Sequence, residues 1–464
     1  MSSYFSKDAI RQQPERLILV LLPATVFAFA MGSSSIHAVA VFGLKFRWAM
    51  FLLLLLVAVA TGWPNRRSIP RWGIATAGVL GVLALLSTAW SVAPLKTAER
   101  ALTFLAVLVI AAAVAATARR SSDFSTRVLV ALLAGPALVA AAGVLVFAFD
   151  HSAAVASASG RGGRYRGFVG NPDGAAMLLA LVCPIAAWSV DEARNSRFRV
   201  AAELTAMLIA GSILFSGSRG AIFAAVAGLI VFGMIRIRAR RRLLPVLAAL
   251  FAVVAIAYAA TDVVASHNPA AVKGQSHAQA SRGGPFTVEL LPNTHSGRSG
   301  IPFVSEFDEI GLPGLYQSKP ILYYGSGRVF AWIEAIRQGL QRPLLGYGFG
   351  TEERVFVDHS YVFRGSFVEN SFVGIFLELG ISGVLLLAAA FVLAAKVGVR
   401  AAQEAAGPER AIIGVGTGVV AAGLVIAFFQ SYLYSVGNVG TLTFWVVLFL
   451  VLAAHAGRPR ERER

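Results

Sequence analysis

The chain alternates between long apolar runs and short polar connections. The first six runs lie at Leu17–Gly32, Trp48–Trp63, Trp72–Trp90, Ala101–Ala118, Val128–Phe149 and Ala175–Val190. The next six lie at Ala201–Ser216, Ala221–Ile235, Leu243–Thr261, Ser371–Ala395, Ala411–Gln430 and Thr441–Ala454. A helix needs about 20 predominantly apolar residues to cross the hydrocarbon core of a bilayer. The pattern therefore predicts an all-α polytopic membrane protein with about 12 transmembrane helices.

The composition agrees with this class of protein. Of the 464 residues, 57% are hydrophobic and 14% are charged, and the mean hydropathy is +0.70. Soluble domains carry about 25% charged residues, so a soluble globular protein is excluded. The lone cysteine, Cys183, lies in an apolar run. It leaves no partner for a disulfide within the chain and no thiolate cluster for a metal.

The net charge of +17 does not indicate a nucleic-acid partner, because the basic residues are regularly distributed. With the N-terminus placed inside the cell, every short even-numbered connection is basic. These residues are Arg66, Arg67 and Arg71; Arg119, Arg120 and Arg127; Arg194, Arg197 and Arg199; Arg236, Arg238, Arg240, Arg241 and Arg242; and Lys396, Arg400 and Arg410. An excess of Lys and Arg on the cytoplasmic side follows the positive-inside rule. Both termini are therefore predicted to be cytoplasmic.

The N-terminus resembles a signal peptide, because Lys7, Arg11 and Arg16 precede an apolar run that contains Ala28-Phe29-Ala30. We expect a retained first helix instead, since the alternation of charged connections is complete without a processed end.

This topology places one long segment, about Asp262–Glu369, outside the cytoplasm. The chain then divides into residues 1–261 with nine transmembrane helices, the loop at 262–369, and residues 370–464 with three more helices and a basic tail. His267, His277 and His295 lie in the loop without the spacing of metal ligands. We expect no metal and no other cofactor.

Within the loop, residues 327–340 have the pattern of an amphipathic helix that lies at the membrane interface or packs over the bundle. One face carries the large apolar residues Val329, Trp332, Ile333 and Ile336. Gly339 is expected to end the helix. Arg328 stands at its N-terminus, where free N–H groups and a guanidinium together favour a phosphate.

Further arginines lie on the same predicted side of the membrane. Arg219 stands alone between two apolar runs, where a cation is costly unless it faces a cavity, a partner or an anion. Snorkelling to the headgroups is the alternative for Arg219. Arg161, Arg164 and Arg166 lie outside, against the orientation rule, and indicate an anionic partner; lipid headgroups are one such partner.

Two asparagines are expected to begin helices. Asn171, followed by Pro172, is predicted to cap the helix over Ala175–Val190. Glu369 and Asn370 open the helix over Ser371–Ala395. Glu378 lies inside that run and is expected to be structural, bonding a neighbouring helix. Glu369 is the stronger candidate for chemistry.

Several motifs stand in an order that is similar to a known family. They are Trp90-Ser91-Val92-Ala93-Pro94, Gly170-Asn171-Pro172-Asp173, Ser218-Arg219-Gly220-Ala221, Ser326-Gly327-Arg328 followed by Trp332, Pro343-Leu344-Leu345-Gly346-Tyr347-Gly348, and Glu369-Asn370 with Glu378-Leu379-Gly380. Together they resemble the O-antigen ligase and polymerase superfamily of bacterial membrane glycosyltransferases. The resemblance spans most of the chain, from about Trp90 to Gly383.

The resemblance implies a GT-C-type glycosyltransferase in the bacterial inner membrane. Such enzymes move a glycan from a polyprenyl (undecaprenyl) diphosphate carrier to an acceptor hydroxyl on the periplasmic face. The acceptor is lipid A core in ligases, another repeat unit in polymerases, and a protein Ser or Thr in the O-oligosaccharyltransferases. Ligases carry a catalytic histidine where this chain has Glu369, and this departure counts against a ligase relative to a polymerase.

By the same resemblance, Arg219 and Arg328 are expected to engage the diphosphate. Arg164 and Arg166, from the basic segment that indicates an anionic partner, are predicted to be further ligands. Two guanidiniums can stabilise the leaving diphosphate without a metal, and Glu369 can deprotonate the acceptor hydroxyl. Attack opposite the diphosphate inverts the anomeric centre. His359 and Asp358 are the alternative bases, and the supporting residues are Asn370, Asn171 and Trp332.

Two readings from other classes remain open. A lipid-linked oligosaccharide transporter or an efflux carrier also has about 12 helices, but it usually shows an internal repeat and discontinuous helices. Neither is evident in this sequence. A noncatalytic scaffold of an envelope-assembly complex is the other alternative. The identity of the glycan, the acceptor and the oligomeric state are not encoded in any motif found here.

Overall fold

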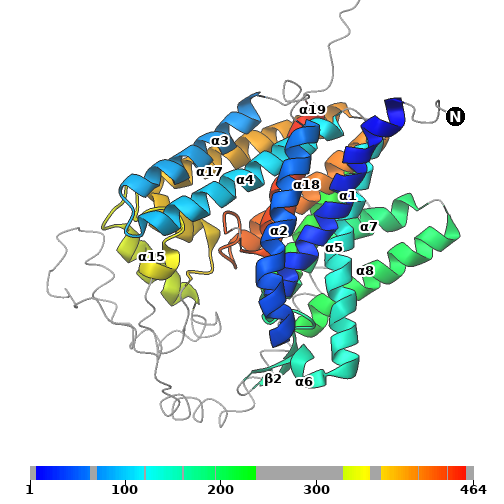
Figure 1. Cartoon of the computed structure of the whole chain (residues 1–464), viewed down its shortest axis with the longest axis horizontal. Coiled ribbons are helices and arrows are strands. Elements are labelled where there is room, and N and C mark those ends of the chain that lie inside the picture. Colours follow the sequence, from blue (N-terminus) through cyan, green and yellow to red (C-terminus); the bar gives the residue numbers. More distant parts are fainter. Residues whose placement is uncertain are drawn as a thin grey trace, which may run out of the picture.

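The computed structural model describes residues 7–62, 71–119, 122–158, 161–193, 195–236, 328–355, 367–405, 407–435 and 437–455. Its first helices are α1 (Lys7–Gly32), α2 (His37–Gly62), α3 (Arg71–Leu86), α4 (Pro94–Ala118), α5 (Ser122–Phe149), α7 (Pro172–Glu192), α8 (Ser196–Ser216) and α9 (Arg219–Arg236). Its later helices are α15 (Arg328–Gly339), α16 (Glu352–Val355), α17 (Ser371–Glu404), α18 (Gly407–Ala427) and α19 (Val439–His455). Figure 1 shows them as one bundle of long helices.

The helices agree with the expected apolar runs wherever the structure describes the chain. Nine described helices are long and apolar enough to cross a membrane, and α3 and α19 are shorter apolar helices. The run Leu243–Thr261 lies outside the described residues, so the total of about 12 spans stays a prediction. The chain is a multi-pass membrane protein.

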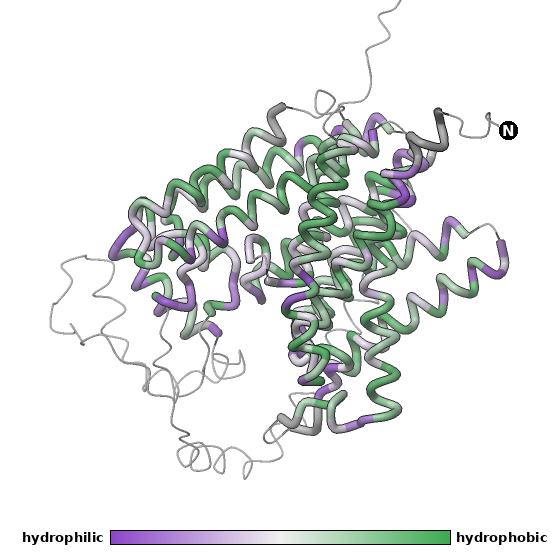
Figure 2. The backbone as a smooth tube through the Cα atoms, in the orientation of Figure 1, coloured by the Kyte–Doolittle hydropathy of each residue, from purple (hydrophilic) through white to green (hydrophobic). Residues whose placement is uncertain are grey.

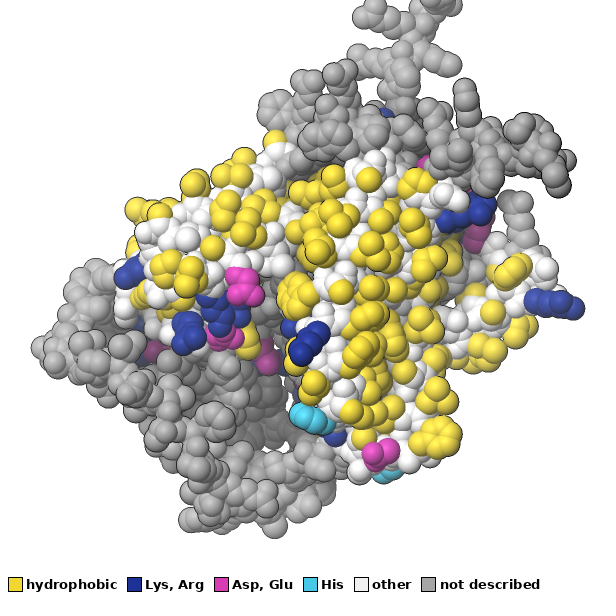
Figure 3. Space-filling view, viewed as in Figure 1, with side chains coloured by type: hydrophobic (Ala, Val, Ile, Leu, Met, Phe, Trp, Pro, Cys, Tyr) yellow, Lys and Arg dark blue, Asp and Glu magenta, His cyan; other side chains and the backbone are white. Residues whose placement is uncertain are grey.

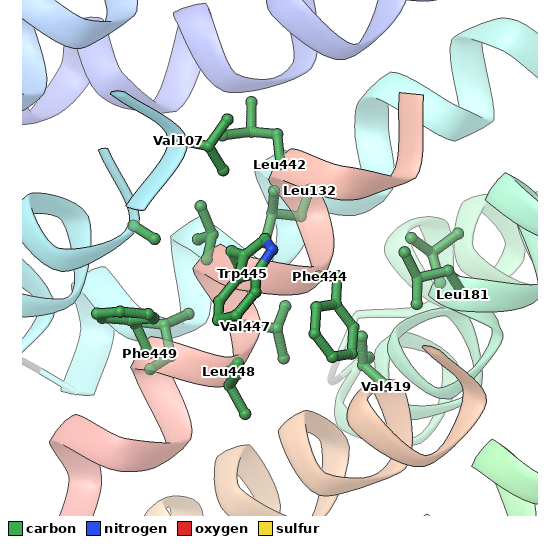
Figure 4. Packing of buried hydrophobic residues seen from close by; sticks show 14 of the residues in the cluster. Val107, Leu132, Leu181, Val419, Leu442, Phe444, Trp445, Val447, Leu448 and Phe449 are labelled. Atoms are coloured by element: carbon green, nitrogen blue, oxygen red, sulfur yellow. The ribbon is translucent and has the colours of Figure 1, made fainter. Parts of the chain in front are cut away.

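Helix α19 lies in the core of the bundle. Its Phe444 and Trp445 are 0% exposed. Figure 4 shows Val107 of α4 beside Leu442 and Leu132 of α5 close to Trp445, with Phe444 beside Val419 of α18. A helix that is apolar on all sides can be surrounded by other helices as well as by lipid. This explains why a run of 17 residues, short for a span, is built into the structure.

The outer surface of the bundle is apolar. Large side chains such as Leu52, Leu56 and Leu145 are more than half exposed. Figure 2 shows hydrophobic residues along the middle of the helices, and Figure 3 shows most charged side chains gathered near helix ends. This distribution suits helices that face hydrocarbon in the middle and water at their ends.

The all-α prediction is wrong for one short segment. After α6 (His151–Ala154), strand β1 (Val155–Ala158) pairs antiparallel with β2 (Arg161–Tyr165). The N–H groups of Arg166 and Gly167 then donate to Ala154 O at 2.9 and 3.0 Å. The apolar periodicity of the spans could not reveal this hairpin, because its backbone bonds and not a core hold it together. It gives Arg164 and Arg166 a fixed position.

Helix α17 is interrupted at Gly380, whose φ of 64° and ψ of −159° are not helical. The break frees backbone carbonyls of the preceding turn. Those of Leu377 and Glu378 accept hydrogen bonds from the N–H groups of Tyr347 and Gly348 at 3.1 and 2.8 Å. The Pro343–Gly348 motif is therefore a backbone partner of α17.

A discontinuous helix was expected of transporters and not of this chain. The structure corrects that expectation at Gly380. The break is filled by protein backbone, since Ile381 N donates to Pro343 O at 2.8 Å. A side chain at Gly380 would come within 2.5 Å of the carbonyl carbon of Leu344. Irregular backbone at such depth is tolerated when it is buried in protein.

Candidate functional site

The site is built at helix ends, beginning with two asparagine caps. Asn171 precedes α7 and its side chain accepts from Asp173 N at 2.9 Å, with Pro172 at the first helical position. Asn370 precedes α17 and its side chain accepts from the N–H groups of Phe372 and Val373. Both caps were predicted from the sequence. They place Asp173 in the first turn of α7 and Glu369 just before α17.

Strand β2 brings Arg164 to the start of α7. The Arg164 guanidinium donates to both Asp173 carboxylate oxygens, at 2.7 and 3.3 Å. Its Nε donates to Ser216 O, at the end of α8, at 2.8 Å. Bidentate pairing between a guanidinium and a carboxylate fixes both groups in position. Arg164 therefore joins the hairpin, α7 and the turn between α8 and α9.

Arg328 and Glu369 form the second ion pair of the site. Arg328 Nε donates to Glu369 Oε2 at 2.8 Å, and Nη2 lies 2.7 Å from the same oxygen. Nη2 also lies 3.9 Å from Asp173 Oδ2. The four residues Arg164, Asp173, Arg328 and Glu369, called the charge cluster below, alternate in sign. Their side chains are between 17% and 30% exposed, so water and ligands can reach them.

Arg219 is the first residue of α9 and follows shortly after Ser216, to which Arg164 donates. Helix α8 ends at Ser216, whose carbonyl accepts from Arg164, and Gly217 has the left-handed φ of 63° that reverses the chain. Arg219 follows two residues later and is half-buried. The structure thus brings three of the four predicted diphosphate arginines to one region.

The fourth, Arg166, is engaged elsewhere. Its Nε donates to Ala153 O at 2.9 Å and its Nη2 to Ser152 O at 3.4 Å. These carbonyls belong to α6, so Arg166 fastens the hairpin to that helix. The structure does not bring Arg166 into the charge cluster.

Helix α15 has the predicted bounds but a different packing face. Ala331 and Ala335 are 2% and 0% exposed, while Ile336 is 38% exposed. A Cβ at Gly339 would come within 2.6 Å of the Phe376 ring on α17. Small residues let two helices approach closely, and this stripe, not the set of large apolar residues, selects the face. Of the predicted set, Trp332 does support the site, because its Nε1 donates to Val368 O at 3.1 Å.

Sequence reasoning missed the carboxyl group behind Glu369. Glu352, the first residue of α16, is 2% exposed. Its Oε1 accepts from Ser431 Oγ at 2.8 Å and from Val368 N. Burial raises the pKa of the Glu352 carboxyl above its ordinary value, against hydrogen bonds from Ser431 and Val368 that lower it. The signal available was the acidic pair in Thr351-Glu352-Glu353, which looks like a solvated turn.

Two other acids are structural. Glu378 is 1% exposed and its Oε1 accepts from Glu352 N at 3.4 Å, so it bonds the start of α16 and not a neighbouring spanning helix. Glu353 pairs with Lys96 and Arg100 of α4, and Arg100 Nη1 donates to Gly350 O at 2.6 Å. These contacts anchor the Gly350–Val355 segment.

The cluster can bind an anion and can hold or accept a proton. Among the described residues, no three His, Cys, Asp or Glu side chains come together as metal ligands. His267, His277, His295, His359 and Asp358 lie outside the described residues, as do Ser326 and Gly327 of the motif that ends at Arg328.

These features define a polytopic membrane protein with arginines and carboxylates gathered at one end of its helices. Residues 204–388 match the family described as O-antigen ligase. This part of the chain is therefore similar to the O-antigen ligase family, in agreement with the order of motifs in the sequence. The matched segment contains Arg219, Arg328 and Glu369, while Arg164 and Asp173 precede it. No curated protein matches the chain.

Proposed function

We propose that this protein is an inner-membrane glycosyltransferase of the O-antigen ligase type. It transfers a glycan from a polyprenyl diphosphate carrier to an acceptor hydroxyl on the periplasmic side, without a metal and with inversion. A polymerase, in which the acceptor is another glycan, is the alternative within the superfamily. The observation that carries the proposal is the sharing of Arg328 between Glu369 and Asp173, with Arg164 beside them.

The charge cluster is balanced without a ligand, since two guanidiniums face two carboxylates. A diphosphate offers the same guanidiniums more negative charge than a single carboxylate does. Arginine suits it because the planar fork can donate two parallel hydrogen bonds to a phosphate. Donor binding would therefore replace carboxylate contacts of Arg328 by phosphate contacts, with Arg219 contributing from the start of α9.

Removing Arg328 from Glu369 has a chemical consequence. In the structure Arg328 Nη2 lies 2.7 Å from Glu369 Oε2 and occupies the side of that oxygen that an acceptor hydroxyl would need to reach. Once the diphosphate holds Arg328, Glu369 is free to take the proton of the acceptor hydroxyl. The acceptor oxygen then bonds to the anomeric carbon, and the bond from that carbon to the diphosphate breaks. The carrier diphosphate leaves with the bonding electrons, and the arginines stabilise its charge.

The test uses purified protein, a polyprenyl-diphosphate glycan and a glycan acceptor. Arg219→Lys keeps the charge but loses the fork, and Arg328→Ala removes a donor, so we expect each to lower transfer about 10²-fold. Arg127→Ala is the matched control, because Arg127 forms an exposed pair with Asp123 at the start of α5. Each variant must be present in the membrane at wild-type abundance.

Wild-type transfer by both Arg219→Lys and Arg328→Ala would refute diphosphate binding by these residues. Transfer abolished by a chelator and restored by a divalent cation would refute the metal-free mechanism. The acceptor that becomes labelled distinguishes a ligase from a polymerase.

A lipid-linked oligosaccharide transporter is the second candidate, because the break in α17 is a feature that transporters share. The two functions differ in one simple respect. An enzyme forms product in detergent micelles, whereas a transporter needs two compartments. Translocation of the donor in vesicles, with no product in micelles, would favour the transporter.

A further inference from the structure

The backbone of Glu369 is held in an unusual conformation. Its φ is 52°, and it is the single non-glycine residue with positive φ within the described part of the chain. Residues other than glycine adopt a positive φ at a cost in free energy, and contacts with the surrounding structure must compensate for it. Those contacts identify residues that control the direction of the Glu369 side chain.

The backbone N–H groups of the two residues that flank Glu369 are both bound by Glu352 and Ser431. Val368 N donates to Glu352 Oε1, and Asn370 N donates to Ser431 Oγ at 3.2 Å. The hydroxyl of Ser431 in turn donates to the same Glu352 oxygen, at 2.8 Å. A single carboxyl oxygen thus holds the N–H before Glu369 directly, and the N–H after it through a hydroxyl.

Both of these residues are themselves held in place. Ser431 lies in the connection between α18 and α19, which Ser371 holds by donating to Gln430 O at 2.7 Å and accepting from Tyr432 N at 3.0 Å. Glu352 is closely packed against α17, since a Cβ at Gly374 would come within 3.2 Å of its Oε2. Glu352 is buried and Ser431 is half-buried.

We infer that Glu352 and Ser431 form a clamp that positions Glu369 toward Arg328 and toward the acceptor hydroxyl. They are positioning residues, because their hydrogen bonds reach the backbone beside Glu369 and not the side chains of the charge cluster. The inference rests on the proposed function only in taking Glu369 as the base. It names two residues on different elements, one of them beyond the segment that matches the family.

The clamp needs a hydrogen-bond acceptor at Glu352 and not a charge. Burial raises the pKa of Glu352, against hydrogen bonds from Ser431 and Val368, and a neutral carboxyl still accepts through its carbonyl oxygen. An amide accepts in the same way. Glu352→Gln is therefore expected to keep the clamp, whereas Ser431→Ala breaks the link to Asn370 N.

The first test compares turnover in purified protein. We expect Ser431→Ala to lower kcat about tenfold or more, because misplacing a catalytic group by even 1 Å is costly. Ser431→Thr keeps the hydroxyl and Glu352→Gln keeps the acceptor, so both are expected to retain most of the activity. Ser189→Ala is the control, since the Ser189 hydroxyl donates only to Ala186 O within α7.

A double-mutant comparison separates positioning from general destabilisation. In a Glu369→Gln background the base is already absent, so Ser431→Ala is expected to cause no further loss of kcat. If the loss of kcat in the double variant equals the product of the two single losses, the clamp is overturned. A wild-type kcat for Ser431→Ala alone would also overturn it.

A second readout does not depend on turnover. Glu369 competes with an anionic ligand for Arg328, so a misplaced Glu369 should leave that arginine more available. Ser431→Ala and Glu369→Gln are therefore both expected to bind inorganic pyrophosphate more tightly than the wild type. Tighter binding in Glu369→Gln alone would overturn the clamp. Wild-type turnover by Glu369→Gln would instead overturn the proposed base, while the comparison of pyrophosphate affinities still tests the clamp.

Discussion

At the scale of single residues, Asp173 has two roles that a helix cap alone does not require. It accepts both hydrogen bonds from Arg164, and its Oδ2 lies 3.9 Å from Arg328. A carboxylate in this position keeps the two guanidiniums together when no ligand is bound. It also adds negative charge where the donor diphosphate is proposed to bind.

We therefore predict opposite effects of Asp173→Asn on stability and on anion binding. Stability should fall, because a partly buried guanidinium pair loses its shared counter-charge. Pyrophosphate should bind about threefold more tightly or better, because one repulsive charge is removed from the site. Calorimetric titration and thermal unfolding in the same detergent measure both quantities.

The control for this change is Asp123→Asn, which breaks an exposed pair with Arg127 at the start of α5. It should alter neither quantity measurably. Weaker pyrophosphate binding by Asp173→Asn would contradict the prediction, and it would indicate that Asp173 mainly holds the arginines in place.

At the scale of elements, the sequence is sufficient to predict a helix where hydrophobic periodicity and a capping residue determine its bounds. Helix α15 begins at Arg328 and ends at Gly339, and Asn171 and Asn370 cap the helices that they precede. These features depend on a few neighbouring residues. The hairpin β1–β2 and the packing face of α15 depend on partners far along the chain, and local pattern located neither.

The site shows the same division. Arg219 and Glu369 were predicted because a charge beside an apolar run is conspicuous, and Arg328 because it begins an amphipathic helix. Glu352 and Ser431 were missed because nothing local distinguishes them from polar loop residues. Their importance comes from a contact across 79 positions of sequence, which no local periodicity encodes.

The break in α17 leads to a second prediction at this scale. Gly380→Ala should destabilise the protein by about 2 kcal/mol or more, because an L residue is strained at φ 64° and its Cβ would meet Leu344 backbone at 2.5 Å. Gly211→Ala, in α8, is the matched control. A Cβ there meets nothing within 4 Å, and alanine favours a helix.

The thermal midpoint in detergent is the measurement. A midpoint for Gly380→Ala equal to that of Gly211→Ala would mean that α17 can close its break, with the Pro343–Gly348 motif displaced. The motif would then be a surface loop and not the backbone partner of α17.

At the scale of the whole molecule, the site is assembled from distant parts of the chain. Arg164 and Asp173 come from the hairpin and α7, Arg328 and Glu369 from α15 and the start of α17, and Ser431 from the α18–α19 connection. Only Arg328 and Glu369 of these five lie in the segment that matches the family. The helices outside that segment therefore complete the site, and the buried α19 holds them around one core.

The orientation of this assembly in the membrane is the remaining prediction. The helices alternate in direction, so the α7–α8 connection and the α6 region with the hairpin lie at opposite ends. Short connections at the first of these ends are basic, with Arg197 and Arg199 beside Ser196. By the positive-inside rule that end is cytoplasmic, which places the charge cluster on the periplasmic side.

Single cysteines at the two ends test this orientation in intact cells. The native Cys183 is first replaced by alanine, although it is mostly buried. Ser152→Cys, beside the hairpin, is expected to react with a membrane-impermeant maleimide, and Ser196→Cys is expected to react only after permeabilisation. Both positions are exposed, so access and not burial decides the result. The reverse pattern would put the charge cluster in the cytoplasm, where a periplasmic glycan transfer could not occur.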